Sequence, residues 1–208
     1  MGITQRRERE REEVRRKILE AARELFTTEG YERVTMRRIA DAIEYSPTTI
    51  YNHFADKNAL VDALCEEDFS RLLTSLAGVE LPADPIEKIR QLGRAYAQFG
   101  RENPNHYRYM FMTPFEQKAG ADHELSQSGE AAFGLLHDAV RDAVRSGRFV
   151  PVEPLAAAQV LWSSLHGVVA LLITYQPDKF PHGAAAPDLV DRVIENGLHG
   201  LLAPAGAR

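Results

Sequence analysis

The feature that most constrains this chain is a series of helical repeats of apolar residues, with short joints between them and no strand alternation. Apolar residues return every three or four positions, as they do on one face of an α-helix. These repeats cover residues 14–29, 35–43, 46–54, 56–77, 85–102, 125–146 and 188–202. Residues 155–175 are apolar nearly all round, which predicts a helix buried on most sides. The expected fold class is therefore all-α.

Side chains that cap helices predict two short helices in the N-terminal part of the chain. Thr35 precedes the first of them. Ser46 precedes the second, with Pro47 at the first helical position, where a missing N–H costs nothing. A preceding helix over 14–29 and a short turn between the two capped helices complete the spacing of a helix-turn-helix unit.

The third of these helices has the composition that recognition of DNA requires. Such a helix is short, presents small or polar residues to base edges and keeps its apolar side on the other two helices. Ile50 and Phe54, four residues apart, form the apolar side. The residues left for the groove and the phosphates are Pro47, Thr48, Thr49, Tyr51, Asn52 and His53. Double-stranded DNA is the expected partner.

The division of charge agrees with a nucleic-acid head on a regulatory body. Residues 1–60 hold twelve Lys/Arg and eleven Asp/Glu, whereas the rest of the chain holds thirteen and nineteen. We expect a helix-turn-helix DNA-binding head over 1–60, and a helical regulatory, ligand-binding and dimerisation body over 61–208. A fourth helix, which begins after Asp56, joins the two. Residues 4–13 have no apolar face and their charges nearly cancel, so we expect a solvated helix extension there rather than an arm that binds DNA.

Residues 18–26, 30–31, 35–40 and 49–57 are, in this order and at these spacings, similar to the head of the TetR/AcrR family. This match is far more specific than a bare helix-turn-helix spacing. The resemblance implies that the residues holding phosphates are Thr35, Thr49, Tyr51, His53 and Lys57. It implies that the residues nearest the base edges are Arg37, Pro47, Thr48 and Asn52.

One residue departs from the family's usual pattern. Glu44 stands in the sharp turn before the third helix, where the family usually has Gly. Gly adopts a left-handed conformation freely, whereas Glu would cost about 1 kcal/mol there. Either the turn is built differently in this chain or the strain is tolerated, and the two alternatives aim the third helix differently.

Two segments of the body, residues 102–111 and 162–167, are similar to the TetR/AcrR subgroup whose C-terminal domain is named for a Trp-His-Gly signature. The resemblance implies a body of helices five to nine, the last two of which pack against a twin subunit. Burial of their apolar residues in a homodimer would remove a large exposed patch. The expected dimer face is residues 155–175 with Val190, Val193, Ile194, Leu198 and Leu201.

The body also carries apolar and aromatic residues with a few polar tips, which is the usual composition of a small-molecule pocket. The candidates for the lining are Tyr96, Phe99, Tyr107, Met110, Phe111, Phe133, Leu136, His137, Trp162 and His166. For each of them the alternative is that the side chain fills the core.

These features together predict a homodimeric repressor that leaves a near-palindromic operator when a small, mostly apolar ligand binds. Two alternatives stay open. One is a regulator that acts as an activator, and the other is a helical dimeric adaptor without a DNA target.

Nothing in the sequence predicts catalysis, a cofactor or a metal site. The G-x-S-x-G, H-E-x-x-H, G-x-G-x-x-G and P-loop signatures do not occur, and the seven histidines have no paired metal spacing. The sequence has no uninterrupted run of eighteen apolar residues, so it predicts no membrane span. The charged N-terminus does not fit a secretory signal. The single cysteine, Cys65, cannot form an internal disulfide. We expect a cytoplasmic regulator and not an enzyme.

Overall fold

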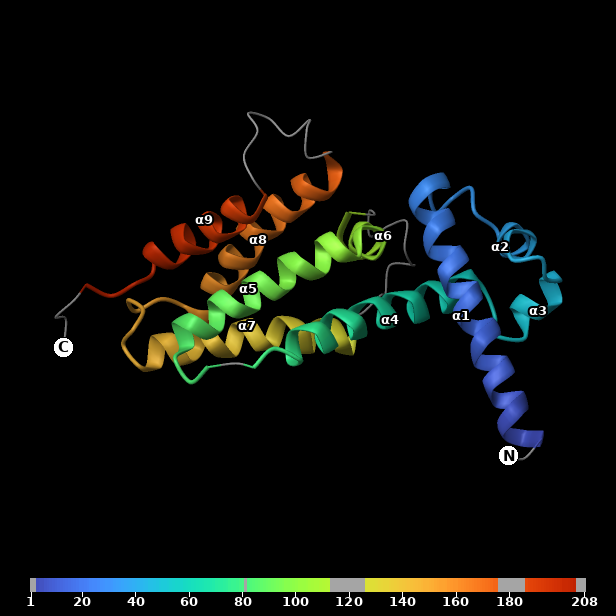
Figure 1. Cartoon of the computed structure of the whole chain (residues 1–208), viewed down its shortest axis with the longest axis horizontal. Coiled ribbons are helices and arrows are strands. Elements are labelled where there is room, and N and C mark those ends of the chain that lie inside the picture. Colours follow the sequence, from blue (N-terminus) through green and yellow to red (C-terminus); the bar gives the residue numbers. More distant parts are fainter. Residues whose placement is uncertain (1–2, 81, 113–125, 176–185, 205–208) are drawn as a thin grey trace. The chain divides into compact units, whose positions relative to one another are not determined.

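Helices make up most of the residues that the computed structural model describes (Figure 1). These residues are 3–80, 82–112, 126–175 and 186–204. Within them, the backbone outside the helices forms one isolated antiparallel bridge, between Phe149 and Leu202, and no longer strand. The predicted all-α fold is confirmed.

The chain forms two compact units. The first consists of Met1–Asp68 and Asn105–Ser126, and the second of Phe69–Pro104 and Gln127–Arg208. Helix α4, Lys57–Ala77, begins in the first unit and ends in the second. This division follows packing, so it does not test the predicted division by function between residues 60 and 61.

The first unit contains the three predicted helices of the head. They are α1 (Ile3–Glu29), α2 (Met36–Ala42) and α3 (Pro47–Tyr51). The unit also contains the start of α4, most of the short helix α6 (Pro104–Tyr107) and the π-helical turn η1 (Arg108–Met112). Because α1 already begins at Ile3, the expected extension over residues 4–13 is helical.

The two short helices begin where their caps predict. Thr35 Oγ1 accepts a hydrogen bond from the backbone N–H of Arg38 at 3.1 Å. Ser46 Oγ accepts one from the backbone N–H of Thr49 at 3.2 Å, and Pro47 takes the first helical position. These bonds satisfy N–H groups that have no partner inside their own helix.

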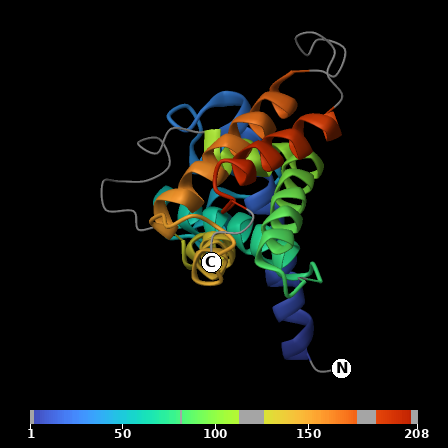
Figure 2. The ribbon, with the colours of Figure 1, turned by 90° about the vertical axis from the view of Figure 1, so that its left-hand side faces the viewer.

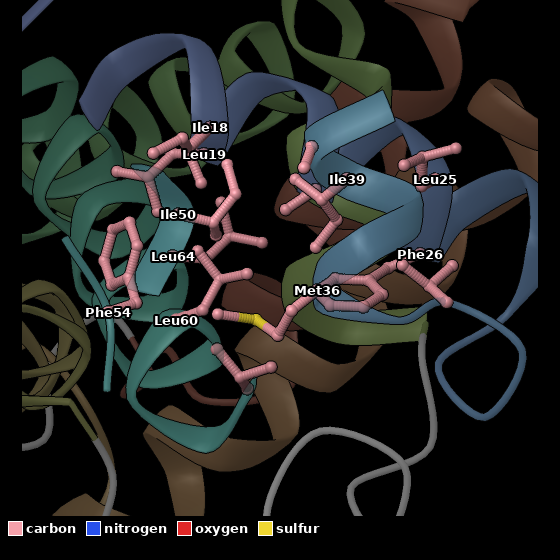
Figure 3. Close-up of a cluster of buried hydrophobic side chains, with 14 of the residues drawn as sticks. Ile18, Leu19, Leu25, Phe26, Met36, Ile39, Ile50, Phe54, Leu60 and Leu64 are labelled. Atoms are coloured by element: carbon pink, nitrogen blue, oxygen red, sulfur yellow. The ribbon is translucent and has the colours of Figure 1, made fainter. Parts of the chain in front are cut away.

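The core of the first unit is one apolar cluster to which α1, α2, α3, α4 and η1 contribute (Figure 3). Ile18 and Phe26 come from α1, Ile39 from α2, Ile50 from α3 and Leu64 from α4, and each is at most 2% exposed. Burial of one such side chain stabilises a fold by about 1.5–3 kcal/mol. Since a helix of five residues is not stable in isolation, the position of α3 depends on the insertion of Ile50 into this cluster.

A buried ion pair joins α1 to α4 inside the first unit. The Arg23 guanidinium donates to Asp68 through Nε at 3.0 Å and through Nη2 at 2.6 Å, and the two side chains are 3% and 0% exposed. Nδ1 of His106, on α6, lies 2.8 Å from the same Asp68 oxygen. Three segments that are distant in sequence therefore meet at one carboxylate.

The second unit contains α5 (Pro85–Glu102), α7 (Gln127–Arg145), α8 (Pro154–Thr174) and α9 (Ala186–His199), and Figure 2 shows α9 beside α8 and α5. Two glycines let α9 approach these helices closely. A Cβ on Gly93 of α5 would lie 2.9 Å from Ile194, and one on Gly197 would lie 2.5 Å from Leu161 of α8. A larger residue at either position would displace the end of the Ile194 or Leu161 side chain.

Two predictions about the last two helices are wrong. Val190, Ile194 and Leu198 do not belong to a dimer face, because they are at most 7% exposed and pack inside their own unit. Their stripe on α9 faces α5 and α8 instead of a second chain. Nor is α8 buried on most sides: Val160 is 64% exposed and Leu171 is 48% exposed. An apolar helical face predicts that the face is buried, but it does not predict which element covers it.

Helix α8 is also long and apolar enough, by length and composition alone, to cross a membrane. The sequence predicted no such helix because the criterion was an uninterrupted apolar run. In α8, Gln159 and Ser163 interrupt the run. In this structure α8 packs against α5, α7 and α9. The core helix of a globular protein can have the same composition, so the test by composition is weak evidence.

Substitution of Asp68 tests the buried ion pair. Asp68→Asn keeps the size of the side chain but leaves the Arg23 charge buried without its counter-charge. Since breaking a buried pair from one side costs about 3–5 kcal/mol, we expect the free energy of unfolding in urea to fall by about 3 kcal/mol. The control is Glu29→Gln, which breaks the more exposed pair between Glu29 and Arg38 and should cost less than about 1 kcal/mol. Equal losses in the two variants would contradict this assignment.

Candidate nucleic-acid interface

The turn between α2 and α3 is short and tightly hydrogen bonded. The backbone N–H of Tyr45 donates to Ala40 O at 3.0 Å and that of Glu44 donates to Asp41 O at 3.3 Å. The Ser46 cap then starts α3, and its Oγ also lies 2.9 Å from the Thr49 hydroxyl. The turn and the cap together fix the direction in which α3 leaves α2.

Glu44 adopts the left-handed conformation that its position in this turn requires, with φ of 60°. Of the two alternatives left by the sequence, the structure therefore has the strained one. The turn has the geometry that glycine would adopt freely, at a cost of about 1 kcal/mol for a residue with a Cβ. The surrounding helices hold this residue in place, so the departure from the family's pattern does not change the turn.

Most of the predicted DNA-contacting residues are at the surface of the first unit. Tyr51 is 53% exposed. The other exposed members of the set are Thr35, Arg37, Thr48 and Asn52, and the half-buried members are Pro47, Thr49, His53 and Lys57. Ile50 and Phe54 point into the core as predicted, at 0% and 5% exposure. Helix α3 thus presents a polar surface on an apolar base.

Arg37 and its neighbour Arg38 differ in what they contact. Arg38 Nη2 donates to Glu29 Oε1 at 2.7 Å, so its charge is shared with the end of α1. Arg37 is exposed, and within the described ranges it forms no ion pair. The structure therefore leaves Arg37, rather than Arg38, available for a partner.

Lys57 is turned toward the first unit itself. Its ammonium donates to Tyr31 O and lies 3.6 Å from the centroid of the Tyr31 ring. Burial lowers the pKa of Lys57, and the nearby Glu32 opposes that shift. An ammonium has three N–H donors, so this contact does not use up the hydrogen-bonding capacity of Lys57.

Arg11 and Arg15 of α1, which are not among the predicted contact residues, act on the residues at the end of α3. Burial lowers the pKa of His53, and the charges of Arg11 and Arg15 on α1 lower it further, while Glu12 has a smaller opposite effect. The Arg15 guanidinium lies over the Phe54 ring, 4.8 Å from its centroid. The four-residue spacing of these arginines was the signal in the sequence that could have identified them.

The predicted ligand-lining residues fall into two sets, one in each compact unit. Tyr107, Met110 and Phe111 belong to the first unit, where Tyr107 and Met110 are buried. The members in the second unit are Tyr96, Phe99, Phe133, Leu136, His137, Trp162 and His166. Phe99 is only 3% exposed.

Tyr96, on α5, is the centre of a polar and aromatic cluster in the second unit. Its hydroxyl accepts a hydrogen bond from Trp162 Nε1 at 3.2 Å and lies 3.3 Å from His166 Nδ1. The Phe133 ring, on α7, meets Trp162 edge-on, with centroids 6.3 Å apart. Burial lowers the pKa of His166, which favours the neutral imidazole. The cluster therefore combines neutral hydrogen-bonding groups with aromatic surface, which is the chemistry of a small-molecule site.

No group of three or more His, Cys, Asp or Glu side chains able to hold a metal ion occurs among the described residues.

Two family models match the chain. The model described as "Bacterial regulatory proteins, tetR family" matches residues 18–64, which contain α2, α3 and the turn between them. The model described as "Tetracyclin repressor-like, C-terminal domain" matches residues 89–196. The narrower resemblance to the Trp-His-Gly subgroup stays a prediction.

One curated relative matches most of the chain, and another matches a shorter part of it. The chain is 30% identical over 172 residues to the nucleoid occlusion factor SlmA of Vibrio campbellii, a match that covers 78% of this chain and 87% of that protein. It is 47% identical over 58 residues to an HTH-type transcriptional repressor of Mycobacterium tuberculosis. That second match covers 28% of this chain and only 31% of the relative's length.

Solved structures share the fold over nearly the full length. A TetR family transcription regulator from Marinobacter aquaeolei VT8 superposes with a TM-score of 0.75 at 20% identity, covering 96% of this chain and 100% of that one. At this level of identity the likeness establishes the fold alone.

Proposed function

Because the chain belongs to the tetR family of bacterial regulatory proteins, we propose that it is a DNA-binding transcriptional repressor that reads its operator with α3. The observation that carries the proposal is the surface of α3, where Thr48 and Tyr51 are exposed while Ile50 anchors the helix in the core. Membership of a family of regulatory proteins also confirms the prediction that the chain is not an enzyme. DNA in the cytoplasm is the partner we assign to it.

The contacts divide by chemistry. Base edges are read by the residues at the exposed start and end of α3 and by one from α2, namely Pro47, Thr48, Asn52 and Arg37. Phosphates are held by Thr35, Thr49, Tyr51, His53 and Lys57, because hydroxyl, imidazole and ammonium groups all donate to phosphate oxygens. Thr49 would exchange its contact with Ser46, and Lys57 would use its remaining N–H donors.

Tyr51 gives the sharpest test of DNA binding, because more than half of its surface is exposed and its removal should not affect folding. Tyr51→Phe removes only the hydroxyl, and a hydrogen bond to a charged group contributes about 1.5–3 kcal/mol. We expect about tenfold weaker binding, at an unchanged melting temperature, to a duplex selected by this protein from a random-sequence library. Fluorescence anisotropy measures the affinity. The control is Tyr175→Phe, which removes a hydroxyl from the second unit. Unchanged affinity in Tyr51→Phe would contradict the contact.

We also assign the chain to a homodimer that forms through the exposed side of α8, because the apolar stripe of α9 is buried in its own unit. Only 22% of the apolar segment of α8 is buried in one chain. Among its exposed residues, one row returns every three or four positions along one side of the helix; it consists of Ala156, Val160, Ser164, Gly167 and Leu171. A Cβ added at Gly167 would meet nothing within 4 Å, so a second helix has room to approach there. Two heads related by a twofold axis would read half-sites about 34–36 Å apart on DNA.

Leu171 and Leu155 provide a matched pair for the dimer, because both are exposed leucines of α8 on nearly opposite sides of the helix. Leu171→Lys would bury a charge in the interface, so we expect the dimer dissociation constant to rise about a hundredfold. Leu155→Lys should leave it unchanged. Sedimentation equilibrium measures both. A dimer that tolerates Leu171→Lys, or that is weakened equally by both changes, would rule out this face.

The proposed effector is a small, mostly apolar molecule that binds at the Tyr96 cluster. It would release the operator only in so far as it prefers the conformation that does not bind DNA. The aromatic surface of Phe133 and Trp162 provides apolar contact, and the hydroxyl of Tyr96 provides polar recognition.

Trp162 is the only tryptophan of the chain, so its fluorescence reports directly on this cluster. We expect a molecule that releases the operator to change the emission of Trp162 and to bind about tenfold more weakly to Tyr96→Phe, which lacks the hydroxyl. Tyr45→Phe, in the head, is the control. A releasing molecule that leaves the emission unchanged and binds both variants equally would place the effector elsewhere.

The match to a nucleoid occlusion factor over most of the chain favours a second candidate function, which is the one that this relative's name states. Both functions need DNA binding. Mapping of the bound sites on the chromosome separates them, because a transcriptional repressor occupies promoters of genes whose transcription rises when it is deleted. Binding at low salt that is absent altogether would instead favour the adaptor without a DNA target.

A further inference from the structure

Helix α1 is much longer than the core of the first unit requires. It begins at Ile3, whereas its first fully buried side chain is Ile18. Residues 4–13 are all exposed. Figure 1 shows the N-terminal turns of α1 projecting beyond α2 and α3. This extension forms none of the apolar contacts of the cluster, so its length has no explanation in the stability of the core.

The arginines of the extension are ordered by the helix. Residues four apart lie about 40° apart around a helix axis, so Arg7, Arg11 and Arg15 follow one side. That side continues into Ile18 and Ala22, which face the core formed with α2, α3 and α4. The arginines therefore stand on the side of α1 that faces the helix-turn-helix.

A ring contact, together with an electrostatic effect, places this side next to the end of α3. Arg15 lies over the ring of Phe54, which follows α3 directly. Arg11 and Arg15 both act electrostatically on His53, the residue before it. Arg7 lies one helical turn further from the core than Arg11, so the row of charge extends past α3.

Two of the four glutamates of the extension are engaged elsewhere. Glu10 accepts from Arg6 at 2.8 Å, and Glu13 lies 3.6 Å from Lys17. In the part of the chain that the structure describes, Arg7 and Arg11 form no ion pair. Both side chains are exposed, and Glu12 offsets the effect of Arg11 and Arg15 at His53 only in part.

We propose that the N-terminal extension of α1, residues 4–13, is a second DNA-contacting surface in which Arg7 and Arg11 bind backbone phosphates next to the base pairs that α3 faces. This proposal rests on the proposed function, because it needs a duplex seated on α3. Guanidinium groups bind phosphate oxygens in a planar, two-pronged geometry, and the row of arginines supplies two of them beyond the predicted contact set. It replaces the expectation, based on net charge, that the extension is only solvated.

The test compares two double variants of the same helix. Arg7→Gln with Arg11→Gln removes the proposed contacts, and Arg9→Gln with Arg16→Gln removes two charges from the opposite side of α1. Binding of each to the selected duplex is measured over a range of salt concentrations. Each phosphate contact contributes about 0.9 to the slope of log K against log salt. For a dimer with four such arginines, the first variant should have a slope shallower by about 3.6, while the control keeps the slope of the natural chain.

A second readout does not need DNA. Removal of Arg11 should raise the pKa of His53, measured by NMR titration, because one of the positive charges that lower it is gone. The control pair should leave that pKa unchanged. An unchanged pKa of His53 in the first variant would overturn the placement of the extension beside α3.

The outcomes separate this proposal from the proposed function. If the natural chain binds the duplex and the two variants have equal slopes, the extension is not a contact surface, although α3 still is. If the natural chain binds no selected duplex at any salt concentration, both proposals fail. A loss of slope in the first variant alone, with the expected shift at His53, supports the second surface.

Discussion

The contact between Arg23 and Asp68 is the interaction on which the first unit depends. Both side chains are almost completely removed from water, and either charge alone in that position would cost several kcal/mol. The carboxylate accepts two N–H groups of the guanidinium and approaches the imidazole of His106. Bonds of this kind fix angles as well as distances. The apolar cluster gives the unit its stability, while this contact fixes how α1, α4 and α6 meet.

The position of α3 depends on how α1 and α4 are packed. Five residues cannot hold a helix in water, so α3 depends on Ile50 between α1 and α4 and on the Ser46 cap. The strained backbone of Glu44 is tolerated for the same reason, because the helices on both sides of the turn are already held. The same α1 that supports α3 carries Arg7 and Arg11 at its other end. One rigid helix thus sets the position of both proposed DNA-contacting surfaces.

The predictions from sequence succeeded where cause and effect lie close together in the chain. A cap such as Thr35 acts on an N–H three residues away, so its outcome can be read locally. Arg23 and Asp68 are 45 residues apart, and no local pattern couples them. The prediction of a dimer face on α9 failed for a related reason, because Leu198 is apolar whether it packs against its own α5 or against a second chain. The exposed side of α8 became visible only once the helices of the second unit were in place.

The net charge of the extension led to a wrong expectation because a sum of charges ignores on which side of the helix each charge lies. Residues 4–13 contain equal numbers of arginines and glutamates, yet a phosphate at contact distance meets only one side of the helix. A helix with its side chains is about 10–12 Å across, whereas salt screens charges over about 8 Å at physiological ionic strength. Glu10 and Glu13 already form ion pairs with Arg6 and Lys17. The effect of Glu12 at His53 is smaller than that of Arg11 or Arg15. The quantity that matters for binding is the charge of the side that faces the partner.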